Sequence, residues 1–230
     1  MSTPGDASVP GAATENGLLD ATASGAQNIV FDFGGVLFRW QPHEFMPRLL
    51  PHRAGSESAV NALVADFFQG YGGDWGDFDR GRVDEARLVQ RIAWRTGMDA
   101  DEVQKVIDAV PSELQLMPHA QPLLRRLRER GHRLFYLSNM PKPYAAHLAR
   151  THPLDEWFIG GVFSSHVGLM KPEPAIFHHA ASAFGIAPRD TLFIDDFALN
   201  IKAARALGWN GLHFLSAAQC EADLSALGLL

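Results

Sequence analysis

Five polar residues of the chain have types and positions suited to chemistry on a charged ligand. They lie at the ends of short apolar runs and are Asp32, Ser138, Asn139, Asp195 and Asp196. If the runs are neighbouring parallel strands, their carboxyl ends share the edge of the sheet where ligands bind in open α/β folds. Three carboxylates gathered there repel one another unless a cation or a proton offsets their charge. Oxygen ligands suit a hard cation, and Mg²⁺ is the usual one beside phosphate.

Lys171 adds a positive charge to this set. It follows a short predicted strand and precedes Pro172-Glu173-Pro174, a sequence that stiffens a loop and begins a helix. A fixed ammonium near a metal and small polar donors is what a phosphoryl group requires. Simpler interpretations stay open: Lys171 as a solvated charge, the aspartate pair as a helix N-cap, and Ser138 with Asn139 as turn residues.

The elements that must position these residues alternate between strand and helix. Short β-branched and aromatic runs predict strands, and apolar residues at helical spacing followed by glycine predict helices. This alternation, with continuously apolar strands, predicts an α/β fold in which a parallel sheet carries helices on both faces. The predicted strands are 28–31, 133–137, 161–163, 191–194 and 211–215, and the predicted helices between them are 119–130, 174–184 and 200–207.

The stretch from residue 42 to residue 112 departs from this alternation. It contains no strand-like run, and its apolar residues recur at helical spacing. We therefore expect a small all-helical domain, residues 42–112, inserted after the first strand of a core formed by residues 28–41 and 113–230. The helices predicted within the insertion are 58–68, 84–96 and 99–110.

Composition and charge exclude several classes of protein. The 230 residues carry 20 Lys and Arg against 26 Asp and Glu, a formal charge of −6, which speaks against a nucleic-acid partner. The single cysteine, Cys220, excludes an internal disulfide framework and a multi-cysteine metal site. No run approaches the roughly 18 apolar residues of a membrane helix, so we expect no membrane partner and a cytoplasmic location. Residues 1–27, rich in Ala, Gly, Ser and Thr and lacking Lys and Arg, predict a disordered tail without a secretory signal.

Four motifs, in this order along the chain, resemble those of the haloacid dehalogenase-like (HAD) hydrolase superfamily. The resemblance spans about residues 28–215, and the predicted helical insertion is similar to the small C1-type cap of that family. It implies a Rossmann-like core, a mobile helical cap and, most often, Mg²⁺-dependent hydrolysis of small phosphate monoesters. The four motifs are Ile29–Leu37, Leu137–Asn139, Lys171–Phe177 and Phe193–Ile201.

The resemblance implies roles for the residues that touch the phosphoryl group. Asp32 matches the nucleophile, which attacks phosphorus and forms an aspartyl-phosphate. Such a carboxylate needs no base to activate it, only relief from the negative charge of the phosphate. Lys171, Ser138, Asn139 and Gly35 match the positions that bind the phosphoryl oxygens.

The resemblance also implies a ligand set for Mg²⁺. Asp32 and Asp196 match the carboxylates that bind the metal, and Gly34 matches a position that serves it through its main-chain carbonyl. Asp195 and Asn200 match residues that support these ligands from behind without binding the ion.

The first motif departs from the family pattern at Gly34, two positions after the nucleophile. Phosphatases of the family usually carry there an Asp that protonates the leaving group and later activates water. General acid–base help is worth about 10²–10⁴-fold, so its absence favours a substrate with a good leaving group. The Asp-x-Gly form is similar to phosphatases of the glucose-1-phosphate type, which implies a sugar phosphate or a related small ester. His43, just past the motif, is a candidate substitute acid.

The glycine-rich segment 70–82 has aromatic residues beside carboxylates. We expect a flexible loop between cap helices, from which Trp75 binds the substrate by stacking. The alternative is a loop that packs against the core with its charges in solvent.

Two other functions stay open for this sequence. A 2-haloacid dehalogenase of the same superfamily would use Asp32 to attack carbon without a metal, and the Asp195-Asp196 pair argues against it. A catalytically idle binding module would account for Gly34, and the presence of Asp32 and Lys171 argues against that. We therefore expect an enzyme that hydrolyses a small phosphate ester with Mg²⁺.

Overall fold

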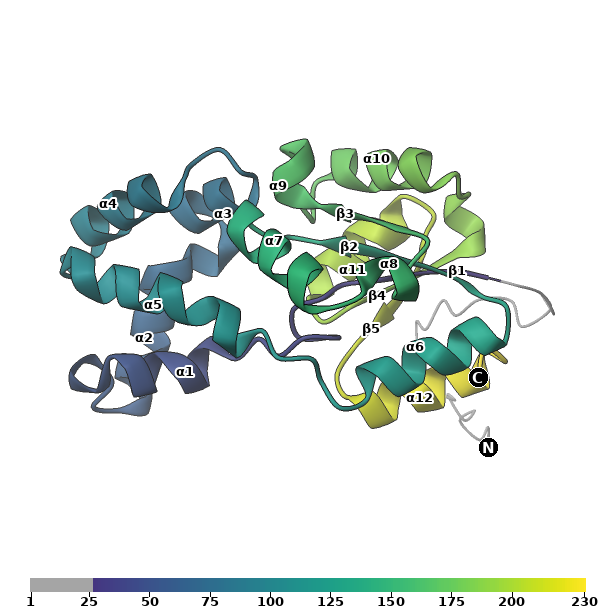
Figure 1. The fold of residues 1–230 in the computed structure, drawn as a ribbon, viewed down its shortest axis with the longest axis horizontal. Helices are drawn as coiled ribbons and strands as arrows, with labels where there is room; N and C mark the ends of the chain where they lie inside the picture. The colour runs from purple at the N-terminus through teal and green to yellow at the C-terminus, as the bar shows by residue number, and fades with distance from the viewer. Residues whose placement is uncertain (1–26) are drawn as a thin grey trace, which may run out of the picture.

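A five-stranded parallel sheet forms the centre of the protein (Figure 1). The computed structural model describes residues 27–230, so the predicted tail lies outside the described residues except for Gln27. The strand order is β3-β2-β1-β4-β5, and every neighbouring pair runs parallel. The predicted α/β fold is confirmed. The strands are β1 (Asn28–Phe31), β2 (Arg133–Ser138), β3 (Gly160–Phe163), β4 (Thr191–Asp195) and β5 (Asn210–His213).

The register of the three inner strands brings the candidate residues to one edge. Phe31, the last residue of β1, pairs with Tyr136 of β2 on one side and with Ile194 of β4 on the other. The main-chain N–H of Asp32 donates to the carbonyl of Ile194 over 2.9 Å and extends the pairing by one residue. Strands buried on both faces need continuously apolar side chains, and β1 and β4 have them. Asp32 and Asp195 follow directly where the apolar run of each strand ends, and both are still buried.

Helices cover both faces of the sheet. On one face α10 and α11 pack against Val30 and Phe193, and on the other α6 and α12 pack around Ile29 and Ile194. The predicted helices 119–130, 174–184 and 200–207 correspond to α6, α10 and α11, whereas α7, α8, α9 and α12 were not predicted. The helices after β1 and its insertion are α6 (Ala120–Glu129), α7 (Lys142–Thr151), α8 (Leu154–Trp157), α9 (Ser164–Val167), α10 (Pro174–Phe184), η3 (Pro188–Asp190), α11 (Ala198–Ala206) and α12 (Ala217–Ala226).

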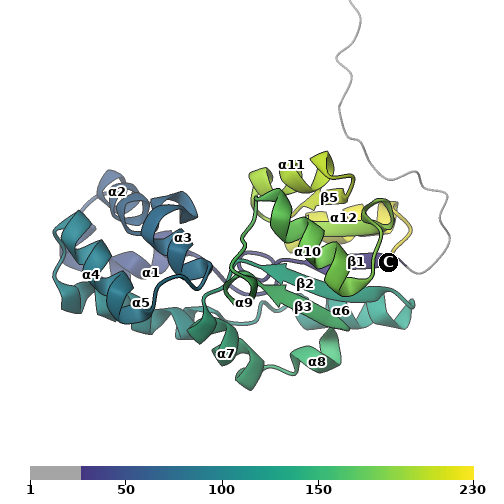
Figure 2. The ribbon, with the colours of Figure 1, turned by 90° about the horizontal axis from the view of Figure 1, so that it is seen from above.

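A second group of helices lies beyond one end of the sheet in both views (Figures 1 and 2). We call residues 42–113, which form this group, the helical unit. Its predicted helices 58–68, 84–96 and 99–110 correspond to α2, α4 and α5, and α5 continues three residues further than predicted. The elements of the unit are α1 (Pro42–Leu49), η1 (Pro51–Arg53), α2 (Glu57–Phe68), η2 (Gln69–Tyr71), α3 (Gly73–Asp79), α4 (Glu85–Thr96) and α5 (Ala100–Glu113).

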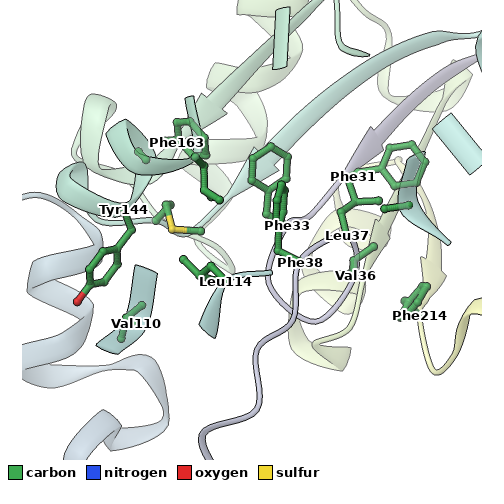
Figure 3. Packing of buried hydrophobic residues seen from close by; sticks show 14 of the residues in the cluster. Phe31, Phe33, Val36, Leu37, Phe38, Val110, Leu114, Tyr144, Phe163 and Phe214 are labelled. Atoms are coloured by element: carbon green, nitrogen blue, oxygen red, sulfur yellow. The ribbon is translucent and has the colours of Figure 1, made fainter. Parts of the chain in front are cut away.

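The helical unit and the sheet share one apolar core (Figure 3). Phe33, just past β1, and Val110 and Leu114, at the end of α5, belong to the same buried cluster. Tyr144 of α7 packs beside them, and its hydroxyl donates to the carbonyl of Ile107 over 3.1 Å. The end of α5 is therefore attached to the sheet by packing as well as by the chain.

The expectation of a flexible loop over residues 70–82 was wrong. Most of that segment is helical, as η2 and α3. The glycines suggested flexibility, but Trp75 and Phe78 are three positions apart and lie on one face of α3, where both are buried. Trp75 packs edge-on against Phe68 with ring centroids 4.6 Å apart. Burial of these aromatic side chains outweighs the low helix propensity of glycine.

None of the helices in residues 27–230 combines the length and the apolar character required to cross a membrane.

Candidate active site

Three carboxylates meet at the carboxyl edge of the sheet. Each of Asp32, Asp195 and Asp196 offers an oxygen within 4.8 Å of those of the other two. Asp32 follows β1, and the other two residues end and follow β4, the neighbouring strand. Asp32 and Asp195 are buried, whereas Asp196 is exposed. The predicted convergence of strand ends is thus what brings these groups together.

Lys171 is the counter-charge at the centre of this cluster. Its side chain is 1% exposed, and its Nζ lies 2.8 Å from Oδ1 of Asp32 and 2.6 Å from Oδ2 of Asp195. Burial lowers the pKa of Lys171, but the carboxylates of Asp195 and Asp32 outweigh it, and the net effect is a raised pKa. The lysine is therefore charged and is not the solvated surface group that the sequence left open.

Asn139 fixes the main chain of the loop that carries this lysine. Its Oδ1 accepts from the N–H of Lys171 over 2.8 Å, and its Nδ2 donates to the carbonyl of the same residue over 3.0 Å. Both polar atoms of the side chain thus hold Lys171 in position. Asn139 also lines the pocket over the carboxylates, so its predicted contact with the phosphoryl group stays a prediction.

Both oxygens of Asp195 are saturated with hydrogen bonds. Oδ1 accepts from the N–H of Phe197 over 2.8 Å and from Nδ2 of Asn200 over 3.0 Å. Oδ2 accepts from Lys171 and, over 3.0 Å, from the same amide of Asn200. Asp195 therefore holds the lysine and is itself held by Asn200, and the oxygens open to a further ligand belong to Asp32 and Asp196.

The turn after β1 leaves room for the carboxylate of Asp196. The carbonyl of Phe33 accepts from the N–H groups of Val36, Leu37 and Phe38, which closes a tight loop. Gly35 has a φ of 74°, and a Cβ added to it would lie 2.1 Å from Oδ2 of Asp196. Glycine is required here for both reasons. In the structure Gly35 lies against the carboxylate of Asp196, and its predicted contact with substrate stays a prediction.

Gathering the carboxylates raises their pKa values. Desolvation is the main cause for Asp32, and Asp195 adds to it while Lys171 opposes it, which brings the pKa of Asp32 to about 6. Desolvation by the pocket walls, followed by the charges of Asp32 and Asp195, raises the pKa of Asp196 to about 7. Lys171 alone therefore does not neutralise the cluster, which favours a further cation.

A pocket opens over the cluster and is closed on its other side by apolar side chains. Its floor includes Asp32, Ser138 and Lys171, and Gly34 and Asp196 also line it. One acidic side chain from the helical unit, Asp79 at the end of α3, lines the pocket too and was not singled out in the sequence. The apolar lining residues are Trp40, Tyr71, Trp75, Val110, Leu114, Met140, Tyr144, Met170 and Phe197.

Two further predicted residues differ in their relation to this pocket. Trp75 lines the pocket, but it is only 3% exposed and packs among the aromatic residues of the helical unit. Most of its side chain therefore contacts the apolar core and not the pocket. His43, the candidate substitute acid, is exposed on α1 and is not among the pocket residues. The sequence does not distinguish Asp79 from the other acidic residues of segment 70–82, because only the structure shows that its side chain is buried.

A family model, proteins of related sequence and solved structures all match this chain. The model for haloacid dehalogenase-like hydrolases matches residues 26–208. The chain belongs to this HAD family of hydrolases. A sesquiterpene phosphatase of Aspergillus oryzae is 26% identical to this hydrolase over 186 residues, which cover 80% of the chain and 87% of the relative.

Solved structures of HAD enzymes share the fold of this hydrolase. A predicted HAD-like family hydrolase from Porphyromonas gingivalis has a TM-score of 0.63 and 28% identity, covering 82% of this chain and 90% of its own. A HAD family enzyme of Bacteroides thetaiotaomicron, crystallised with magnesium and inorganic phosphate, has a TM-score of 0.64 and 23% identity, covering 82% and 94%. The second likeness concerns the fold alone.

Proposed function

We propose that this HAD hydrolase is a Mg²⁺-dependent phosphatase that cleaves small phosphate monoesters through an aspartyl-phosphate at Asp32. The observation that carries the proposal is the position of Lys171, buried between Asp32 and Asp195 beside the open carboxylate of Asp196. A phosphoryl group brings negative charge to a nucleophile that is itself negative. Two such charges 4 Å apart repel by roughly 4 kcal/mol at an effective dielectric of 20, and fixed cations offset this cost.

The geometry assigns each atom of the nucleophile a task. Oδ1 of Asp32 accepts from the N–H of Phe33 over 2.7 Å and pairs with Lys171. Among the described residues no donor is recorded for Oδ2, which is therefore the oxygen that attacks phosphorus. Lys171 and the hydroxyl of Ser138, which lines the same pocket, bind the non-bridging oxygens of the phosphoryl group.

The residues present fit a magnesium ion. The candidate donors are all oxygens, as this cation prefers: the carboxylates of Asp32 and Asp196 and the carbonyl of Gly34. Asp195 supports the site by accepting a hydrogen bond from Lys171, and Asn200 supports it by donating to Asp195. Bound there, Mg²⁺ neutralises charge on the transferring phosphoryl group.

The pocket walls favour an ester with an apolar or aromatic group. Trp40, Tyr71, Leu114 and Phe197 are among the side chains that would surround the group attached to phosphate. A sugar, which the Asp-x-Gly motif led us to expect, needs several hydrogen-bonding partners, and this wall offers few. The sesquiterpene named for the Aspergillus phosphatase is an apolar group of this kind. We therefore propose an apolar phosphate ester ahead of a sugar phosphate.

Hydrolysis of 4-nitrophenyl phosphate with and without Mg²⁺ tests the function. We expect turnover by the full-length wild type that EDTA abolishes and that Asp32→Asn lacks. A panel of phosphate esters, from isoprenoid and benzyl to hexose phosphates, then ranks the substrate classes. Activity of Asp32→Asn equal to that of the wild type would refute the proposal.

The same assay separates the two rival functions. Turnover of a 2-haloacid that survives EDTA would indicate a dehalogenase, against which the open carboxylate of Asp196 argues. The absence of an acid at Gly34 is the observation that favours a catalytically idle binding module. An enzyme that becomes phosphorylated on Asp32 in stoichiometric amount and never turns over would support that alternative.

A further inference from the structure

Asp79 is a buried carboxylic acid that the proposed function has not used. It ends α3 of the helical unit, is 3% exposed, and lines the same pocket as Asp32. Its main chain is tied to the sheet domain, because its carbonyl accepts from Oγ of Ser164 over 2.5 Å and that Oγ accepts in turn from the N–H of Met140. The main chain of Asp79 is therefore attached to the segments that follow β2 and β3.

The carboxyl of Asp79 has no partner of its own among residues 27–230. No hydrogen bond or ion pair to it is recorded there, and the neighbouring Arg80 pairs with Glu173 instead. Burial raises the pKa of Asp79 well above its ordinary value; Arg80 opposes this rise and the charge of Asp32 adds to it. Burial without a partner favours the neutral form of a carboxyl, which is the form that can donate a proton.

We propose that Asp79 is the general acid and base of the phosphatase reaction. It would take the role that related phosphatases give to an aspartate at the position of Gly34. This inference rests on the proposed function. In phosphoryl transfer the attacking and leaving oxygens lie roughly in line. With Asp32 attacking from the sheet, the leaving oxygen points away from the sheet, toward the pocket wall that the helical unit supplies, and Asp79 is the acid on that wall.

The two half-reactions balance with Asp79 as the proton carrier. In the first, Oδ2 of Asp32 forms a bond to phosphorus, the ester P–O bond breaks, and the leaving oxygen takes the proton of Asp79 to give the alcohol. In the second, the oxygen of a water molecule forms a bond to phosphorus, its proton passes to the carboxylate of Asp79, and the bond between phosphorus and Oδ2 of Asp32 breaks, which regenerates the Asp32 carboxylate. Inorganic phosphate leaves, and both aspartates return to their initial states.

Leaving-group dependence distinguishes an acid from a residue that only packs. Benzyl phosphate and 4-nitrophenyl phosphate are similar in size, but the benzyl alkoxide needs protonation whereas nitrophenolate does not. For Asp79→Asn we expect kcat/KM on benzyl phosphate to fall by about 10²–10⁴-fold, with a change below roughly tenfold on the nitrophenyl ester. We also expect a burst of nitrophenol followed by slow turnover, because the base for the second step is missing.

Asp77→Asn is the matched control on the same helix. Asp77 is half-buried, pairs with Arg91 over 2.9 Å and does not line the pocket, so we expect no change in the ratio of kcat/KM between the two substrates. Equal losses on both substrates for Asp79→Asn, or no loss, would overturn the inference. A wild type inactive on both esters would overturn the proposed function and the inference with it.

A variant that keeps Asp79 tests the same point if Asp79→Asn does not fold. An added Cβ at Gly34 would lie 3.6 Å from Trp40, an ordinary contact, so Gly34→Asp fits the turn. If Asp79 already supplies the acid, a second acid introduced by Gly34→Asp gives no gain in benzyl phosphate turnover in the protein that keeps Asp79, whereas it restores turnover in the Asp79→Asn background. A gain of about 10²-fold or more in benzyl phosphate turnover by the Gly34→Asp single variant would mean that the wild type has no general acid, and would overturn the inference.

Discussion

Replacing Lys171 with methionine removes the charge at the centre of the site with little change in length. The ammonium lies 2.8 Å from Asp32 and 2.6 Å from Asp195, and the side chain is 1% exposed. Breaking a buried ion pair by removing one partner costs about 3–5 kcal/mol. For a protein of this size that corresponds to a fall in Tm of about 6–20 °C in metal-free buffer at pH 8.

The loss of stability in Lys171→Met depends on pH with a definite sign. In the wild-type protein the pKa of Asp32 is about 6, already above its value in the unfolded chain. Without the lysine this folded-state pKa rises further. A carboxyl with a raised folded-state pKa destabilises the fold above that pKa, and the penalty disappears as pH falls and both states become protonated. The gap in stability between variant and wild type should therefore narrow from pH 8 through pH 6 toward pH 4.

Thermal and urea unfolding monitored by circular dichroism measure this gap. Lys202→Met is the control, since Lys202 is exposed on α11 and no ion pair is recorded for it within residues 27–230. We expect it to shift Tm by less than about 2 °C at every pH. Two results would contradict the description of Lys171 as a buried cation between two carboxylates. One is a Lys171→Met variant as stable as this control, and the other is a difference in stability from wild type that stays constant from pH 8 to pH 5.

Three further predictions follow from the same site. Gly35→Ala should lose most of its activity and of its Mg²⁺-induced rise in Tm, because the new Cβ displaces Asp196; normal metal stabilisation in this variant would count against that contact. Trp75→Ala should cost about 3–5 kcal/mol of stability in urea unfolding, as a buried aromatic residue does; a loss under 1 kcal/mol would mean that Trp75 serves the substrate rather than the core. Mg²⁺ binding should release protons near pH 6.5, because a divalent cation lowers the raised pKa values of Asp32 and Asp196. Calorimetry in two buffers of different ionisation enthalpy detects that release, and identical heats would argue against carboxylate ligation.

The strand ends could be predicted from the sequence because their signals are local. An apolar run that stops at a polar residue marks the edge of a parallel sheet, and Asp32, Asp195 and Asp196 meet for that reason. Lys171 could be predicted as a site residue because prolines follow it and stiffen its loop. The five strands, their parallel arrangement and the helices α6, α10 and α11 followed from the same alternation, whereas the order of the strands in the sheet did not.

Features set by contacts between distant segments could not be predicted. Trp75 of α3 packs against Trp40 and Tyr144, which are far from it in the sequence, and this burial is what separates the helix from the loop that its glycines suggested. The two hydrogen bonds between Asn139 and the main chain of Lys171 join residues 32 positions apart. Asp79 is one acidic residue among several in its segment, and its burial over the site arises only when the helical unit packs against the sheet.

The most direct test of the account is to find the phosphoryl group on the enzyme. Wild-type protein mixed with 4-nitrophenyl phosphate and Mg²⁺, quenched in acid during the first turnover and digested, is analysed by mass spectrometry. We predict that the peptide containing Asp32 carries the mass of one added phosphoryl group and that Asp32→Asn carries none. Turnover without any phosphorylated peptide, or a phosphoryl group on another residue, would contradict the assignment of Asp32 as the nucleophile.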